Sequence, residues 1–177
     1  MRTYKYFDNV NHIIALNVKK NAVFTEQACQ FCGSKNDCLE GVYFEKNNIE
    51  SVCVECLAQS KTSVYIPDEI QSKIVRDRIK KVGELSITPP VAWVQSNEWP
   101  VCCDDYMKYI GEWEKTDFIN QSSHEEYINY FKKLLDKKML ERIDDIETLI
   151  EDLGYDSVAY AFRCIYCNKI TIVCQDY

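Results

Sequence analysis

The chain has 177 residues, of which 46% are hydrophobic and 28% charged, a composition typical of a folded globular protein. Its formal net charge is −7, and an acidic surface repels phosphate backbones, so general nucleic-acid binding is disfavoured unless a local basic patch exists. No window approaches the roughly 18 consecutive apolar residues of a transmembrane helix. The N-terminus lacks the apolar run of a signal peptide. Ten cysteines without an export signal predict a cytoplasmic protein whose thiols bind metal and do not form a disulfide framework.

Short strands and one short helix are predicted in the first third of the chain. Residues 1–28 form an extended lead-in with strand-like pieces, and residues 41–44 form a further strand. A short helix is predicted to begin at residues 57–60. These elements surround the first cysteine motif of the chain.

Two CxxC pairs separated by 20 residues (positions 33 to 52) match a four-thiolate zinc site; they are Cys29, Cys32, Cys53 and Cys56. Two residues between the cysteines let a tight turn aim both sulfurs at one centre. Gly33 follows the first pair and tolerates the positive φ of such a knuckle. The second pair completes a tetrahedron with Zn–S distances of about 2.3 Å. The alternative, four buried apolar thiols, would not require this pairing.

A helix is predicted to begin at Pro67 and to end at Gly83. Its apolar residues recur at helical spacing and predict a buried stripe; they are Ile70, Ile74, Val75, Ile79 and Val82. The basic residues between Lys73 and Lys81 are interpreted as its solvated face. They are also the only basic cluster that could contact a phosphate.

Three further helices and two strands are predicted beyond the break at residues 88–90. The helices span about 104–111, 123–139 and 143–153, and the second has a capping-box start. Strands at 157–162 and 170–173 flank a third CxxC pair.

That third pair, Cys164 and Cys167, requires two further ligands if it binds zinc. The candidates are Cys102, Cys103, Cys174 and, less favoured, His124. The preferred site joins Cys103 to Cys164 and Cys167, with Cys102 as the fourth ligand. Neighbouring residues point in different directions in regular structure, so both can bind one ion only if the chain makes an unusual local turn. Alternatively, one of the two lies in the core.

No catalytic residue is predicted, and the chain is expected not to be an enzyme. It contains no phosphate loop, no HExxH and no GxSxG. His12 and His124 stand apart from any nucleophile pattern. A redox role for a CxxC pair is disfavoured because no βαβ pattern surrounds Cys29 or Cys164. Cys38 and Cys174 are expected to be free thiols, and Asp104 or Asp105 could hydrogen-bond a zinc ligand.

Several motifs occur in an order that resembles the CbrC (UPF0167-type) family of small bacterial proteins. They lie at residues 4–7, 29–33, 41–43, 53–56, 88–95, 99–105, 111 and 159–167. In that family the position matching Cys102 is often histidine, which supports Cys102 as a ligand. The chain departs from the family by carrying Asn168 where glycine is usual, but asparagine also tolerates the left-handed turn. Residues 112–150 match no motif of the family.

The resemblance implies tolerance or immunity to a DNase-type colicin and no catalytic activity. Many nuclease toxins are basic, so an acidic cytosolic protein would complement their charge. The primary hypothesis is therefore a non-enzymatic, zinc-stabilised protein that binds another protein, such as a basic bacteriocin or contact-dependent nuclease toxin. It predicts an exposed acidic or aromatic face, for example on the helix at 123–139.

Two other functions remain open. A nucleic-acid-associated zinc-ribbon protein requires one exposed patch made by Lys73, Arg76, Arg78, Lys80 and Lys81. A thiol-based redox or metal-sensing protein requires an exposed, metal-free pair of cysteines.

The predicted fold class is α+β, with two cysteine-rich zinc-ribbon or knuckle modules and short strands joined by several helices. The N-terminal module spans residues 1–66. Residues 67–177 form a helical region with a zinc-ribbon-like half, unless the whole chain folds as one compact domain. Two structural Zn²⁺ ions are predicted, and the protein is expected to have no membrane partner.

Overall fold

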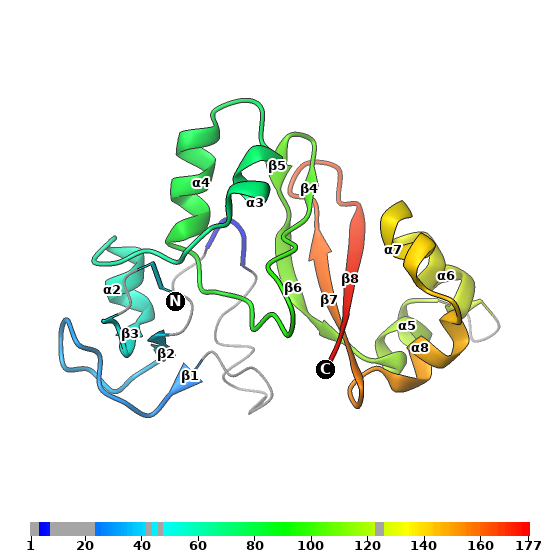
Figure 1. Ribbon diagram of the computed structural model, residues 1–177, viewed down its shortest axis with the longest axis horizontal. Coiled ribbons are helices and arrows are strands. Elements are labelled where there is room, and N and C mark those ends of the chain that lie inside the picture. The colour runs from blue at the N-terminus through cyan, green and yellow to red at the C-terminus, as the bar shows by residue number, and fades with distance from the viewer. Residues whose placement is uncertain (1–3, 8–23, 42–43, 46–47, 123–125) are drawn as a thin grey trace. The chain divides into compact units, whose positions relative to one another are not determined.

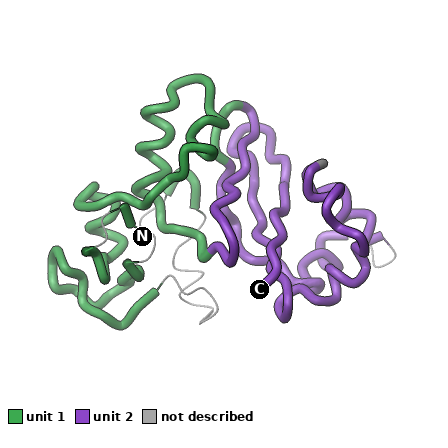
Figure 2. Tube along the Cα trace, viewed as in Figure 1, with its two compact units in different colours: residues 1–92, 104–106 green, residues 93–103, 107–177 purple. Residues whose placement is uncertain are grey.

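The computed structural model of the chain describes residues 4–7, 24–41, 44–45, 48–122 and 126–177 (Figure 1). Helices and short antiparallel strands are both present, which confirms the α+β class. The chain forms two compact units: residues 1–92 with 104–106, and residues 93–103 with 107–177 (Figure 2). No helix in the described ranges is long and apolar enough to cross a membrane.

Unit 1 contains a small antiparallel sheet followed by short helices. The sheet has the strand order β1–β2–β3, with Cys38 opposite Cys53. The predicted short helix after the second CxxC pair is present and begins at Val54, within the pair itself. The elements of unit 1 are β1 (Phe24–Thr25), β2 (Cys38–Glu40), β3 (Ser51–Cys53), α2 (Val54–Ala58), α3 (Asp68–Ser72), α4 (Arg78–Ser86) and β5 (Asp105–Tyr106).

The single helix predicted from Pro67 to Gly83 is wrong, because the chain breaks it into α3 and α4. Asp77 lies between them with a left-handed φ of 53°. The backbone N–H groups of Val75 and Arg76 donate to the Asp104 carboxylate at 2.9 and 3.0 Å, so they leave the helical hydrogen-bond pattern. The break also splits the predicted apolar stripe. Ile70 and Ile74 are buried, whereas Val75 is 78% exposed and Ile79 is 93% exposed.

Unit 2 is built on an antiparallel sheet with the strand order β6–β7–β8. Both strands predicted around the third CxxC pair are confirmed as β7 and β8, which pair along their whole length. The elements of unit 2 are β4 (Val101–Cys102), β6 (Lys108–Trp113), α5 (Lys115–Gln121), α6 (Tyr127–Leu134), α7 (Lys137–Arg142), α8 (Ile146–Asp152), β7 (Ser157–Arg163) and β8 (Ile170–Asp176).

The helix predicted at 104–111 is also wrong. Cys103 and Asp104 both have left-handed φ angles, of 55° and 56°, and the chain then enters β5 and β6. Adjacent acidic residues are a common helix-start signal, but here Asp104 caps the segment before α4 and Asp105 is fully buried. Tyr109 of β6 lies opposite Phe162 of β7, so this part of the stretch is a strand of the β6–β7–β8 sheet.

Helices α5 to α8 of unit 2 gather beside the sheet and close its core (Figure 1). Phe118 of α5, Phe131 of α6 and Ile150 of α8 pack with Ile172 and Cys174 of β8. The helix predicted at 123–139 is divided in two, because Asp136 caps α7 by accepting a hydrogen bond from the Met139 N–H. Residues 123–125, which include two of the four residues of the predicted capping box, lie outside the described residues. The predicted helix at 143–153 is confirmed as α8, and Gly154 follows it with a φ of +87°.

Two isoleucines on either side of Asp77, at the break between α3 and α4, test whether the break separates a buried position from an exposed one. Ile74→Ala removes a fully buried side chain and is expected to lower the free energy of unfolding by about 2–5 kcal/mol. Ile79→Ala, the same substitution at a 93% exposed position, should change it by less than about 0.5 kcal/mol. Chemical denaturation of both variants measures the difference. Equal losses would mean that both side chains lie on one buried stripe.

The start of α8 gives a prediction of pH dependence. The Asp145 carboxylate accepts hydrogen bonds from the Thr148 hydroxyl and from the Thr148 and Glu147 N–H groups, which hold the pKa of Asp145 below its usual value. This stabilisation is present above the unfolded-state pKa, near 4, and is lost as the pH falls through the lower folded-state value.

Asp145→Ala should therefore lower the thermal midpoint by a few degrees at pH 7, and the gap to the unmodified protein should close towards pH 3. Asp144→Ala is the matched control, because Asp144 is an exposed neighbour that caps no helix. A gap that is independent of pH would contradict the role assigned to the carboxylate.

Candidate metal centres

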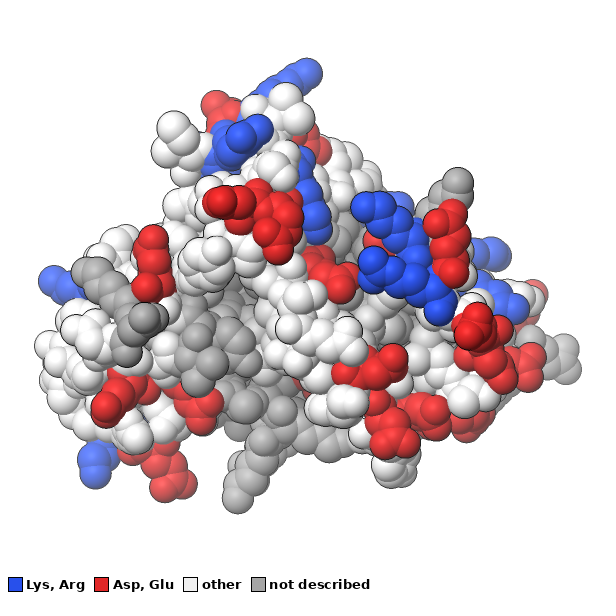
Figure 3. All heavy atoms as spheres, viewed as in Figure 1, with Lys and Arg blue, Asp and Glu red and all other residues white. Residues whose placement is uncertain are grey.

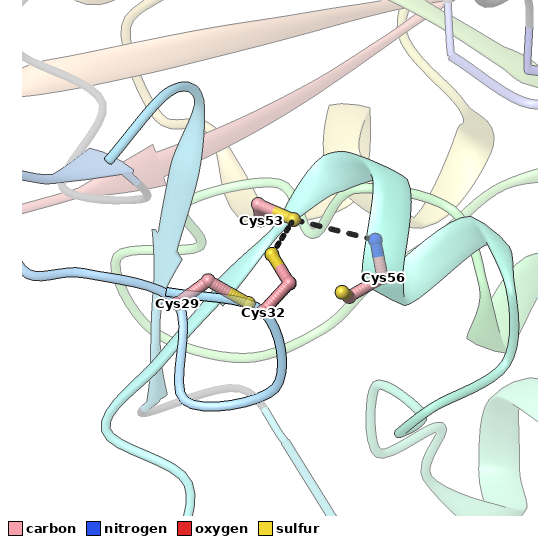
Figure 4. A group of neighbouring side chains, drawn as sticks. All are labelled: Cys29, Cys32, Cys53 and Cys56. Carbon is pink, nitrogen blue, oxygen red and sulfur yellow. Dashed lines mark hydrogen bonds between the residues drawn. The ribbon is translucent and has the colours of Figure 1, made fainter. Parts of the chain in front are cut away.

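Cluster 1 consists of the four cysteines of the first two CxxC pairs, Cys29, Cys32, Cys53 and Cys56. Their Sγ atoms all lie within 4.8 Å of one another and turn towards a common centre (Figure 4). Cys32 Sγ and Cys53 Sγ are 3.6 Å apart. A tetrahedral zinc with Zn–S bonds of about 2.3 Å requires sulfurs about 3.8 Å apart, so the donor set fits a metal ion of this kind.

Local backbone structure places each half of cluster 1. In the first pair, the Cys29 N–H donates to the Ser34 carbonyl at 2.7 Å and the Gly33 N–H donates to the Cys29 carbonyl at 2.8 Å. Gly33 has a φ of +73°, as the sequence predicted. In the second pair, Cys53 ends β3 and is the N-cap of α2, where its Sγ accepts a hydrogen bond from the Cys56 N–H at 3.4 Å.

The electrostatics of cluster 1 favour a bound cation. Burial opposes ionisation of Cys29, but N–H groups of the backbone, from Cys53, Phe31 and Cys32, outweigh it and lower the pKa of Cys29 to about 6. Burial and the neighbouring thiols raise the pKa of Cys56. Four thiolates this close repel one another, so a divalent cation is what allows all four to ionise together.

Cluster 2 consists of Cys102, Cys103, Cys164 and Cys167, and its Sγ atoms also lie within 4.8 Å of one another. Cys102 Sγ lies 3.8 Å from Cys103 Sγ and 3.6 Å from Cys167 Sγ. The structure therefore brings together the preferred second ligand set. The unusual turn that this set requires is present, since Cys103 has a left-handed φ of 55°.

The other half of cluster 2 is a knuckle between β7 and β8. The Cys164 N–H donates to the Lys169 carbonyl at 2.8 Å, and the Asn168 N–H donates to the Cys164 carbonyl at 3.1 Å. Asn168 has a φ of 59°, so asparagine does take the left-handed position where glycine was expected. Burial opposes ionisation of Cys164, but N–H groups of Cys167 and Tyr166 lower its pKa to about 7.

The remaining sulfur and histidine candidates lie elsewhere. Cys38 is buried and its thiol donates to the Ser34 carbonyl, and Cys174 is buried in the core of unit 2. Among the described residues, neither joins a group that could hold a metal ion. His124, the less favoured fourth ligand, and His12 lie outside the described residues.

Asp105 is a buried polar residue whose role the sequence reasoning missed. Its side chain accepts a hydrogen bond from the Tyr6 hydroxyl at 2.7 Å and pairs with Lys5 Nζ at 3.1 Å. Lys5 also pairs with Glu84 at 2.8 Å. Burial and the neighbouring carboxylates raise the pKa of Tyr6. The Asp105 carboxylate is therefore used within unit 1, and Asp104 likewise bonds to the segment before α4 and not to a thiol.

The basic patch required for nucleic-acid binding is only partly available. Lys81 is 14% exposed and its ammonium donates to the Asp104 carbonyl. Arg78 donates through Nε to the Ile74 carbonyl at 2.8 Å. Lys81 is thus used within the fold of unit 1, whereas Lys73, Arg76, Arg78 and Lys80 are exposed.

Substitution of single cysteines distinguishes ligands from spare thiols. Cys56→Ser removes a cluster 1 thiolate and is expected to reduce the zinc content by one ion per chain, because three protein ligands hold structural zinc poorly. Cys38→Ser should leave the zinc content unchanged, although Cys38 is buried nearby. Elemental analysis of protein purified without added zinc measures both. Equal zinc in the two variants would remove Cys56 from the ligand set.

Comparison with known proteins identifies the family of the chain. A search of curated proteins and a search of solved structures each found no match. The sequence profile described as "Uncharacterised protein family (UPF0167)" matches residues 2–176, essentially the whole chain. This result confirms the family predicted from the order of the motifs. The chain therefore belongs to the uncharacterised protein family UPF0167.

Proposed function

We propose that this chain is a non-enzymatic, zinc-stabilised protein that acts in the cytoplasm by binding a basic protein partner. The main support for the proposal is that each cluster offers a full set of four thiol ligands. Each supplies four thiols within 4.8 Å of one another, which is a complete tetrahedral shell for zinc. A closed shell leaves no position for water or substrate, so the metal contributes to folding and not to catalysis.

The chemistry of the donors favours zinc over other abundant ions. Thiolates are soft ligands, whereas magnesium and calcium bind oxygen. A tetrahedral set of four sulfurs suits zinc or iron–sulfur chemistry. The paired knuckles, with their N–H groups directed at Cys29 and Cys164, support a structural zinc in each unit. A reducing cytoplasm keeps such thiols available for the metal.

The charge of the surface supports a basic partner. The net charge is −7, and acidic side chains gather over α5 and α8 (Figure 3). Asp144, Asp145, Glu147 and Glu151 are all exposed. The face predicted on the helix at 123–139 is not found on α6, because Tyr127 and Tyr130 pack against the core and the last turn carries Lys132 and Lys133. Electrostatic complementarity of this kind mainly raises the association rate and the specificity.

The finer proposal concerns the identity of the partner. The family resemblance implies tolerance to DNase-type colicins, and we propose that the partner is the basic nuclease domain of such a toxin. Its binding would confer tolerance or immunity. The acidic surface of α8 supports a basic partner. The family resemblance supports a nuclease toxin as that partner.

Direct binding tests the proposal. Zinc-loaded full-length protein is titrated by calorimetry with the purified nuclease domain of a DNase-type colicin and with a lysozyme of similar positive charge. We expect the nuclease complex to persist at about 0.15 M salt, where exposed charges are largely screened, and the lysozyme complex to be lost. Equal binding to both proteins, or none to either, would contradict a specific toxin partner.

Charge-reversal variants locate the surface. Asp144→Lys combined with Glu147→Lys should weaken nuclease binding at least about tenfold, because it places positive charge against a basic partner. Glu26→Lys combined with Glu50→Lys makes the same change of charge at exposed positions of unit 1 and should have a smaller effect. Equal weakening by the two pairs would mean that net charge, and not the α8 surface, determines binding.

A further inference from the structure

The two clusters differ in how many thiols the solvent reaches. In cluster 1, Cys32 is the single exposed thiol, and the other three are 2–6% exposed. In cluster 2, Cys164 is the single buried thiol, at 1% exposure. Cys103 and Cys167 are exposed and Cys102 is intermediate. Reaction of thiolates with dissolved oxidants requires access, so cluster 2 presents the more accessible sulfurs.

The two clusters also differ in how many of their ligands lie in regular structure. In cluster 1 the exposed Cys32 lies in a turn, but Cys53 and Cys56 belong to β3 and α2, where regular hydrogen bonds hold the main chain. In cluster 2 only Cys102, at the end of β4, lies in regular structure, while Cys103 lies in a left-handed turn and Cys167 in the turn between β7 and β8. Turn residues can shift to a new sulfur geometry without breaking a strand or a helix.

We propose that cluster 2 is a site of reversible oxidative modification, at which a peroxide oxidises zinc-bound thiolates and releases the ion while cluster 1 retains its own. The inference rests on the proposed binding of zinc by both clusters. It assigns different roles to two motifs of the same composition, one that maintains the fold and one that responds to oxidant.

The chemistry requires hydrogen peroxide as the two-electron oxidant. An exposed thiolate attacks one peroxide oxygen, the O–O bond breaks, and the products are a sulfenic acid and hydroxide. A second thiolate of the cluster then attacks the sulfenic sulfur, and hydroxide leaves as the disulfide forms. Two sulfurs are oxidised and peroxide is reduced to two hydroxide ions, which take up two protons from the solvent to give water. The zinc ion loses two of its four ligands and dissociates.

The distances within cluster 2 indicate which disulfide forms. Cys167 Sγ lies 3.6 Å from Cys102 Sγ, so a short movement of the exposed knuckle brings them to bonding distance. Cys103 Sγ is almost as close to Cys102 Sγ, at 3.8 Å. A disulfide between these adjacent residues would, however, close a small strained ring. The expected product is therefore the Cys102–Cys167 disulfide.

Stepwise oxidation of the zinc-loaded full chain tests the inference. Zinc is first counted by elemental analysis, and the protein is then titrated with hydrogen peroxide while a colorimetric chelator records zinc release. Differential alkylation and mass spectrometry assign the oxidised cysteines. We expect one zinc ion to leave at least about threefold faster than the other, together with loss of the Cys102 and Cys167 thiols. Reductant and zinc should then restore both thiols and the second ion.

The outcomes separate this inference from the proposed function. Fewer than two zinc ions before oxidation would contradict the zinc sites themselves. Two ions that leave together, or earlier loss of the cluster 1 thiols, would overturn the assignment of cluster 2 as the oxidant-sensitive site. Oxidation to sulfinic or sulfonic acid without a disulfide would overturn its reversibility.

Serine variants of the two exposed knuckle thiols provide a matched control. Cys167→Ser should abolish the Cys102–Cys167 disulfide. Cys32→Ser removes the exposed thiol of cluster 1 and should leave that disulfide unchanged in mass spectra, whether or not cluster 1 keeps its metal. Loss of the disulfide in both variants would contradict an independent response of cluster 2.

Discussion

The central feature of the structure is that four thiols converge at one point in each of two clusters. Sulfur atoms within 4.8 Å of one another cannot all carry negative charge without a cation between them, yet the backbone prepares one sulfur of each set to ionise. Local backbone N–H groups thus favour the thiolate form of Cys29 and Cys164. A bound metal ion would balance the negative charge of the whole set. The β-sheets of both units are small, and a metal ion bound at each cluster would supply the cross-link that a larger apolar core otherwise provides.

Both clusters consist of four cysteine thiols, but the secondary structure around them differs. Cluster 1 sits where a strand becomes a helix, so regular structure fixes half of its ligands. Cluster 2 joins an irregular left-handed turn to the tip of a β-hairpin. A four-sulfur set that held zinc would leave no ligand position for a substrate at either place, and under the proposed function the charged surface of the protein would bind the partner.

The sequence predicted the CxxC knuckles of both sites well because that signal is local. Spacing within each CxxC pair fixes a turn, and even the requirement for an unusual turn at Cys103 could be stated in advance. Helices were predicted less well. The break at Asp77 depends on the Asp104 carboxylate, which captures two N–H groups from a segment 28 and 29 residues earlier. Asp105 depends on Tyr6, 99 residues away. Neither partner can be read from a local pattern of apolar and polar residues.

The pairing of Asp105 with Tyr6 and Lys5 has a consequence for synthesis on the ribosome. Unit 1 draws residues 104–106 from beyond the start of unit 2, so it cannot close until about the first hundred residues have emerged. Chains grow from the N-terminus and domains usually fold as units in that order. The nascent protein therefore holds all four cluster 1 thiols outside the ribosome before its own fold is complete. If cluster 1 binds its metal ion at that stage, the ion would order these four cysteines before unit 1 closes.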